Sequence, residues 1–121
     1  MANSQSTLRA NAALAGSENL PDQDSPYARG VIINVVTTNK ASSASLVAKI
    51  QGKTKLGTYF DLPGAATAAI TSNTVTTLVL RPGVAATANS SVPGGLPRQW
   101  RVVLTLSGGT YDCSVTADLL T

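Results

Sequence analysis

Few side chains in this sequence could perform nucleophilic or acid–base chemistry. Among its 121 residues there is no histidine and a single cysteine, Cys113. Histidine is the commonest general base in enzymes, so its absence removes the usual activator of a nucleophile. Cys113 lies in a segment of alternating apolar residues, where we expect its thiol to point inward and to have a high pKa. We therefore interpret Cys113 as a core residue.

The carboxylates are too dispersed to form a catalytic pair. Asp112 and Asp118 share one face of a predicted strand, but six residues of strand separate them by about 20 Å. That distance is too long for an acid–base couple acting on one bond. A lone cysteine without histidine also excludes a structural zinc site and a disulfide within the chain. We expect no catalytic residues, no cofactor and no metal.

The segment Gly52-Lys53-Thr54 resembles the end of a phosphate-binding loop. That motif needs another glycine five positions earlier, where this sequence has Val47, and a helix directly after the threonine. Neither requirement is met. The sequence instead predicts a hairpin tip at which Lys53 and Lys55 are solvated.

The charge is unevenly distributed along the chain. Residues 1–28 carry one Arg against three acidic residues, whereas residues 29–121 carry eight Lys or Arg against three Asp. The body is therefore basic, which suits an acidic partner, although a simply solvated surface is the alternative. We expect no nucleic-acid partner, because most of the five aromatic side chains are predicted to point inward rather than toward bases.

The elements that position these residues are predicted to be strands. Alternation at period two is clearest in residues 99–106, which place Trp100 on an apolar face and Arg101 on the opposite one. We expect Trp100 to be an anchor buried between two sheets, the alternative being an exposed interface residue. Arg101 should reach solvent or a partner, where a guanidinium can hold a carboxylate in bidentate fashion.

Turn signals separate about seven strands and no long helical period occurs. The expected strands are residues 31–38, 46–51, 58–62, 65–70 (a strand or a tight turn), 75–80, 100–106 and 110–119. We expect a hairpin from the second and third, and antiparallel pairing of the last two. The predicted fold class is all-β, a single antiparallel β-sandwich, Ig-like or jelly-roll-like, with a barrel as the alternative.

Two segments are predicted to be irregular. Residues 1–28 are rich in Ser, Asn, Gln and Ala, and their leucines recur every six residues, which fits neither helix nor strand. We interpret them as a flexible N-terminal arm that orders on a partner, or as a disordered leader without a role, preceding a sandwich domain of residues 29–121. Residues 84–99 form a long connection that is a candidate contact surface.

The body of the chain resembles a group of small virion proteins of tailed bacteriophages, typically encoded close to the major capsid protein. The resemblance rests on these phrases, in order: Tyr27-Ala28-Arg29-Gly30, Lys49-Ile50-Gln51-Gly52-Lys53, Tyr59-Phe60-Asp61-Leu62-Pro63-Gly64, Leu80-Arg81-Pro82-Gly83 and Leu96-Pro97-Arg98-Gln99-Trp100-Arg101-Val102. It implies a decoration or cement protein that binds the major capsid protein on the capsid exterior and braces adjacent capsomers. It also implies a homo-oligomer on a symmetry axis, a trimer or, at two-fold sites, a dimer.

The residues that we expect to contact a partner combine the arm's apolar side chains with aromatic and basic ones. They are Leu8, Arg9, Leu14, Leu20, Tyr27, Arg29, Arg81, Arg98 and Arg101. The alternative function is a tail- or fibre-associated β-sandwich that binds a host surface glycan, which requires exposed aromatic rings such as Trp100 and Tyr59.

The sequence also gives an expectation for location. It begins without the basic residues and apolar run of a signal peptide, and no segment approaches the roughly 18 apolar residues of a membrane span. We therefore expect synthesis in the host cytoplasm, a final place in the virion and no membrane partner.

Overall fold

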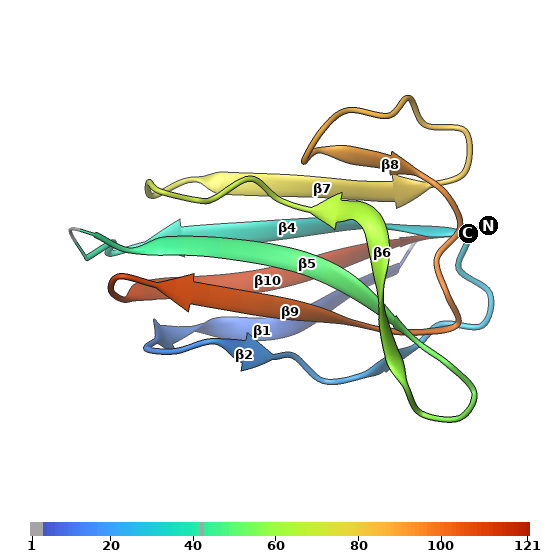
Figure 1. The fold of residues 1–121 in the computed structure, drawn as a ribbon, viewed down its shortest axis with the longest axis horizontal. Coiled ribbons are helices and arrows are strands. Elements are labelled where there is room, and N and C mark those ends of the chain that lie inside the picture. Colours follow the sequence, from blue (N-terminus) through green and yellow to red (C-terminus); the bar gives the residue numbers. More distant parts are fainter. Residues whose placement is uncertain (1–3, 42) are drawn as a thin grey trace.

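The computed structural model describes residues 4–41 and 43–121, which form ten strands and no helix. The strands are β1 (Ser4–Leu14), β2 (Glu18–Asn19), β3 (Gln23–Asp24), β4 (Gly30–Thr38), β5 (Ser45–Lys53), β6 (Tyr59–Ala66), β7 (Val75–Arg81), β8 (Ser91–Pro93), β9 (Gln99–Ser107) and β10 (Tyr111–Leu120). Sheet A has the order β1-β10-β4-β7-β8, and sheet B has the order β2-β9-β5-β6, with β3 also on β9. Every pair is antiparallel except β7 with β8. The predicted all-β, two-sheet architecture is confirmed (Figure 1).

The core lies between the two sheets and is filled by alternate residues of the long strands. On β4, in the middle of sheet A, Val31, Ile33 and Val35 are buried while the residues between them are half-buried. This pattern fits a central strand, because its neighbours β10 and β7 shield even its outer face. Burying such β-branched side chains provides the main favourable free energy of a sandwich core.

Strand β9 contributes the largest side chain of the core. Trp100 is 1% exposed, and its Nε1–H donates a hydrogen bond of 3.2 Å to the hydroxyl of Ser25, itself buried. The indole therefore has its apolar area in the core and its one polar hydrogen satisfied. The prediction that Trp100 is a buried anchor is confirmed.

The predicted pairing of the last two strands is wrong. β9 pairs with β5, β2 and β3 in sheet B, whereas β10 pairs with β1 and β4 in sheet A. The connection between them passes from sheet B to sheet A at the surface and has Gly108 at φ 75°, where a Cβ would also overlap the carbonyl group of Ser43. Alternation identifies which face of a strand is buried but not which strand lies next to it. The buried faces of strands in both sheets point into the same core, so the pattern is the same for either sheet. The expected hairpin of β5 and β6 is confirmed.

The flexible arm predicted for residues 1–28 needs correction over its described part, residues 4–28. β1 pairs with β10 along the edge of sheet A, and β2 and β3 pair with β9 in sheet B. Leu8, Leu14 and Leu20 are 8%, 0% and 3% exposed and belong to the core. The segment orders on the sandwich itself, because burying three leucines offsets the entropy of fixing its backbone. Residues 1–3 lie outside the described part.

The strand count is ten rather than about seven for two reasons. The N-terminal segment adds β1, β2 and β3, and the long connection of residues 84–99 contains β8. One difference lowers the count: the separate strand expected at residues 65–70 does not form. β6 extends to Ala66, and Ile70 forms only an isolated bridge with Leu46.

Candidate functional site

The side chains with potential for covalent or metal chemistry are apart from one another. Cys113 is fully buried, and desolvation raises the pKa of its thiol above the ordinary value, so it is the core residue that the sequence predicts. Within residues 4–41 and 43–121, no group of three or more His, Cys, Asp or Glu side chains could hold a metal ion. No helix that could span a membrane occurs in this part of the chain.

Basic side chains gather instead at one end of the sandwich, where β4 and β9 begin, β7 and β10 end and the β5–β6 hairpin turns (Figure 1). We call this surface the basic end. It comprises Arg29, Lys53, Lys55, Arg81, Arg98 and Arg101. Four separate stretches of sequence supply these residues, so only the topology brings them to one end of the molecule.

Three cations of the basic end have no partner for their side chains in the described part of the chain: Arg29, Arg81 and Lys55. Arg29 and Arg81 line one recess together with Pro82, Leu120 and Thr121. The backbone of Arg29 is fixed, because its N–H donates to the Leu120 carbonyl at 2.7 Å and its carbonyl accepts from Leu96 N–H at 2.9 Å. The carbonyl of Arg81 likewise accepts from Gly94 N–H at 3.1 Å, so the backbones of both arginines are held while their guanidinium donors are unused.

Lys53 and Arg98 line a second recess at the same end and are paired with carboxylates. Lys53 Nζ lies 2.8 Å from Asp22 Oδ2, and Arg98 Nε lies 3.0 Å from Asp24 Oδ1. The hydrogen bond to Asp22 raises the pKa of Lys53, and the hydrogen bond to Asp24 raises the pKa of Arg98. Arg98 remains 68% exposed along its side chain, so its ion pair is open to solvent and weak.

Arg101 is held on the outer face of sheet B. Its guanidinium carbon lies 3.5 Å from the ring centroid of Tyr59, and its Nε–H donates to Gln51 Oε1 at 2.9 Å. The Tyr59 hydroxyl donates in turn to Asp22 at 2.7 Å. Arg101 thus ties β9 to β6 through a cation–π contact, and it is less available to a partner than Arg29 or Arg81.

The structure divides the predicted partner residues into two groups. Tyr27 is 84% exposed and lies at the basic end with Arg29, Arg81, Arg98 and Arg101. Leu8, Leu14 and Leu20 are core residues, so the prediction that they contact a partner is corrected: their side chains already fill the space between the sheets. Arg9 is likewise used within the fold, since its side chain is 10% exposed and bound to four groups.

Sequence reasoning missed Lys55 as a member of this surface and interpreted it only as a hairpin tip. The residue does lie in the β5–β6 turn, but the turn is at the end of the molecule that also carries Arg98, and both line one recess. No local signal in the sequence indicates this proximity. The burial of Trp100 also removes one of the two rings that the glycan-binding alternative requires.

Fold and surface together define a two-sheet β-sandwich with a basic end. No family of sequences, no curated protein and no solved structure matches this chain.

Proposed function

We propose that this chain is a structural virion protein that decorates a bacteriophage capsid. It binds the major capsid protein through its basic end and braces adjacent capsomers on the exterior of the shell. The observation that carries this proposal is the pair Arg29 and Arg81, whose side chains have no partner in the described part of the chain and line one recess, with the exposed Tyr27 two residues before Arg29 in the sequence. The phrases that resemble phage virion proteins include all three of these residues.

Physical chemistry favours a protein partner with acidic groups. Arginine and tyrosine are enriched among residues that carry binding energy, because each combines a flat apolar area with hydrogen-bond donors. A guanidinium binds a carboxylate with two parallel hydrogen bonds, and its fixed backbone reduces the entropy lost on binding. A role in binding rather than catalysis suits a site built from cations without a nucleophile or base.

The proposed protein is a homo-oligomer, a trimer or, at a two-fold position, a dimer. A capsid presents identical surfaces around symmetry axes, so a decoration protein gains contacts by matching that symmetry. Each copy then presents its basic end to an equivalent acidic surface, and the weak contacts of single copies combine.

The test is co-sedimentation of the full chain with shells assembled from the major capsid protein of the same genome. Arg81→Ala should weaken binding by roughly tenfold to a hundredfold, because an interfacial charged hydrogen bond contributes roughly 1.5–3 kcal/mol. Lys40→Ala is the matched control, since it removes the same charge just after the end of β4, the strand whose start is at the basic end, and its binding should be unchanged.

Two results would contradict separate parts of the proposal. Shells that leave the wild-type chain in the supernatant would overturn the decoration role. Binding of wild type and Arg81→Ala with equal affinity would overturn the assignment of the basic end while leaving the decoration role standing.

A further inference from the structure

Most sheet edges in this molecule are protected against pairing with another chain. β1 is irregular, with register shifts on both sides of Arg9, whose guanidinium donates to the carbonyls of Ala12 and Ala13 at 2.9 and 3.0 Å. β2 and β3 have two residues each, and β8 has three and ends at Pro93. β6 contains Pro63 and a register shift. Bulges, prolines, charges and short length are the usual devices that prevent edge pairing.

The first half of β7 lacks these devices. β8 pairs only with Val79, Leu80 and Arg81, so residues 75–78 have no strand on the side away from β4. These residues are uncharged, contain no proline and pair with β4 in a regular register. Val75 is 62% exposed. An open, neutral and regular edge is a template for one more strand.

Hydrogen bonding establishes which backbone groups are available. Thr74 exchanges two hydrogen bonds with Thr37 of β4, at 2.9 and 3.1 Å, and Val79 N–H donates to Ser90 on the opposite side at 2.9 Å. Backbone groups of successive residues alternate in direction along a strand. Val75 and Thr77 therefore point their N–H and C=O groups away from β4, where no strand of the described chain pairs with them.

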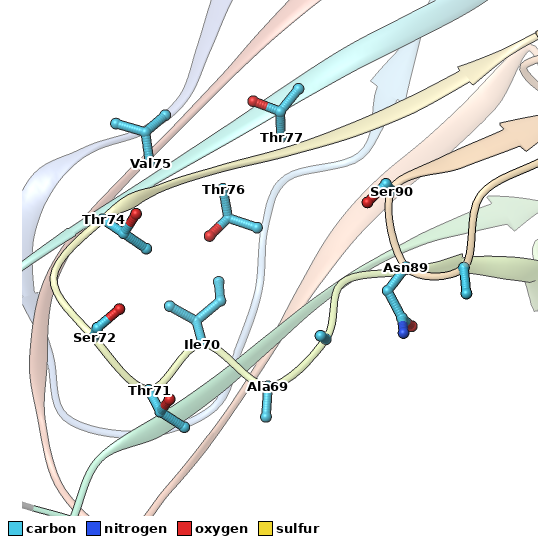
Figure 2. Close-up of a pocket in the computed structure, with 12 residues that line it drawn as sticks. Ala69, Ile70, Thr71, Ser72, Thr74, Val75, Thr76, Thr77, Asn89 and Ser90 are labelled. Carbon is cyan, nitrogen blue, oxygen red and sulfur yellow. The ribbon is translucent and has the colours of Figure 1, made fainter.

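These groups lie at the rim of a groove of about 440 Å³. One wall is the connection of residues 68–72, and the other includes Asn89 and Ser90 (Figure 2). Ile70 and Thr76 point toward one another between the walls. All twelve lining residues are uncharged, none is aromatic, and the alanines at 68, 69 and 88 leave room for neighbouring side chains.

We propose that this groove binds one extended, uncharged segment of a partner protein, which adds a strand to the open edge of β7. Val75 and Thr77 exchange backbone hydrogen bonds with the segment, and Ser, Thr, Ala or Val side chains fit the walls. The open stretch of β7 is only residues 75–78, and the groove beside it is lined by residues 68–72 and by Asn89 and Ser90, so the occupant is a short segment donated by a partner and not the edge of a second copy of this sandwich. The inference is independent of the capsid proposal, because the groove contains no residue of the basic end.

The probe is a segment Ser-Thr-Val-Thr-Val-Thr-Ser joined to Thr121 of the full chain by a Gly-Ser linker of about 20 residues, whose average span is roughly 25 Å. Tethering provides an effective concentration in the millimolar range, on the order needed for a short strand. Hydrogen exchange of the Val75 and Thr77 amides should slow by about tenfold with this tail. A tail with proline at alternate positions is the control, because it lacks the donors for pairing.

Two substitutions in one loop test the groove itself. Ala88→Arg places a long charged side chain on the lining and should abolish the protection, whereas Ala85→Arg alters an exposed alanine that does not line the groove and should preserve it. Equal exchange of Val75 and Thr77 with both tails would overturn the proposal. Protection that rises with the concentration of the untailed chain would assign the groove to a second copy and would also overturn it.

Discussion

At the scale of the residue, Arg9 shows how a largely buried charged side chain can bind two strands at the edge of a sheet together. Its Nη1–H groups donate to the carbonyls of Cys113 and Ala12 at 2.6 and 2.9 Å, and its Nη2–H donates to Ala13 at 3.0 Å. Glu18 lies 3.1 Å from Nε. The guanidinium thus donates to carbonyls of both strands next to the register shifts of the β1–β10 ladder, and it has few donors left for a partner.

Asp22, in contrast to Arg9, is exposed. Its carboxylate accepts hydrogen bonds from Lys53 of β5 and Tyr59 of β6. Hydrogen bonds from Lys53 and Tyr59 lower its pKa below the ordinary value of 3.8. The unfolded chain therefore takes up this proton first as the pH falls. The stability that the carboxylate contributes is present above the unfolded pKa and is lost as the pH falls through the lower, folded pKa.

We accordingly predict a pH-dependent effect of Asp22→Asn. The melting temperature of the wild-type chain should fall more steeply below a pH of about 4 than that of the variant, which has no carboxylate to protonate. Lys53→Gln should reduce the steepness in the same direction, because it removes the larger cause of the lowered pKa. Thermal melts followed by circular dichroism measure both, and superimposable pH profiles of wild type and Asp22→Asn would contradict the prediction.

At the scale of the element, β1 is the strand on which sequence and structure differ most. Its two buried leucines, Leu8 and Leu14, are six residues apart, and register shifts on both sides of Arg9 separate them. A bulged strand does not keep period two, so the pattern that identifies β5, β9 and β10 is absent here. Composition then predicts a flexible arm, because small polar residues dominate the segment.

Leucine-to-alanine substitutions distinguish a strand from an arm. Leu14→Ala should lower the free energy of unfolding by about 2–5 kcal/mol, since the side chain is fully buried and its removal leaves a cavity. Leu56→Ala is the matched control, because Leu56 is 94% exposed in the β5–β6 turn, and it should change stability by less than about 0.5 kcal/mol. Urea denaturation measures both, and equal small effects would indicate that residue 14 is not in the core.

The sequence was sufficient to predict which face of each strand is buried, but not which strands lie next to one another in the sheets. Trp100 and Cys113 are buried as alternation predicts, but β9 and β10 lie in different sheets because the connection after Ser107 passes from sheet B to sheet A instead of forming a hairpin. The same limit applies to the site. Tyr27 and the arginines could be predicted as surface residues from their residue types. The proximity of Lys55 to Arg98 depends on the order of strands in the sheets, which local sequence does not encode.

At the scale of the whole molecule, the charge is organised along the long axis. The basic end carries six of the nine Lys and Arg residues, and two of the six pair with Asp22 and Asp24. Exposed cations that face an acidic partner attract it over a distance of about one Debye length, roughly 8–10 Å at 0.10–0.15 M salt. The proposed binding through this end should therefore be sensitive to ionic strength.

We predict that the affinity of the wild-type chain for capsid shells falls as sodium chloride increases from 50 to 500 mM, by about tenfold or more, because salt screens exposed charge pairs. The variant Arg29→Ala/Arg81→Ala should show a shallower dependence, since it has two fewer cations at the contact. Co-sedimentation at several salt concentrations measures both slopes, and parallel slopes would place the contact elsewhere on the molecule.

The pairing of β1 with β10 has a consequence for biosynthesis. Ser4 is the partner of Leu119, so the ladder of β1 cannot form until the residues up to β10 have been synthesised. While the ribosome synthesises the intervening residues, the N-terminal strand and its leucines lack their native neighbours. Contacts between distant parts of a chain also slow folding, to the range of about milliseconds to seconds for such topologies. Native folding of this sandwich is therefore completed only after β10 has left the ribosomal exit tunnel.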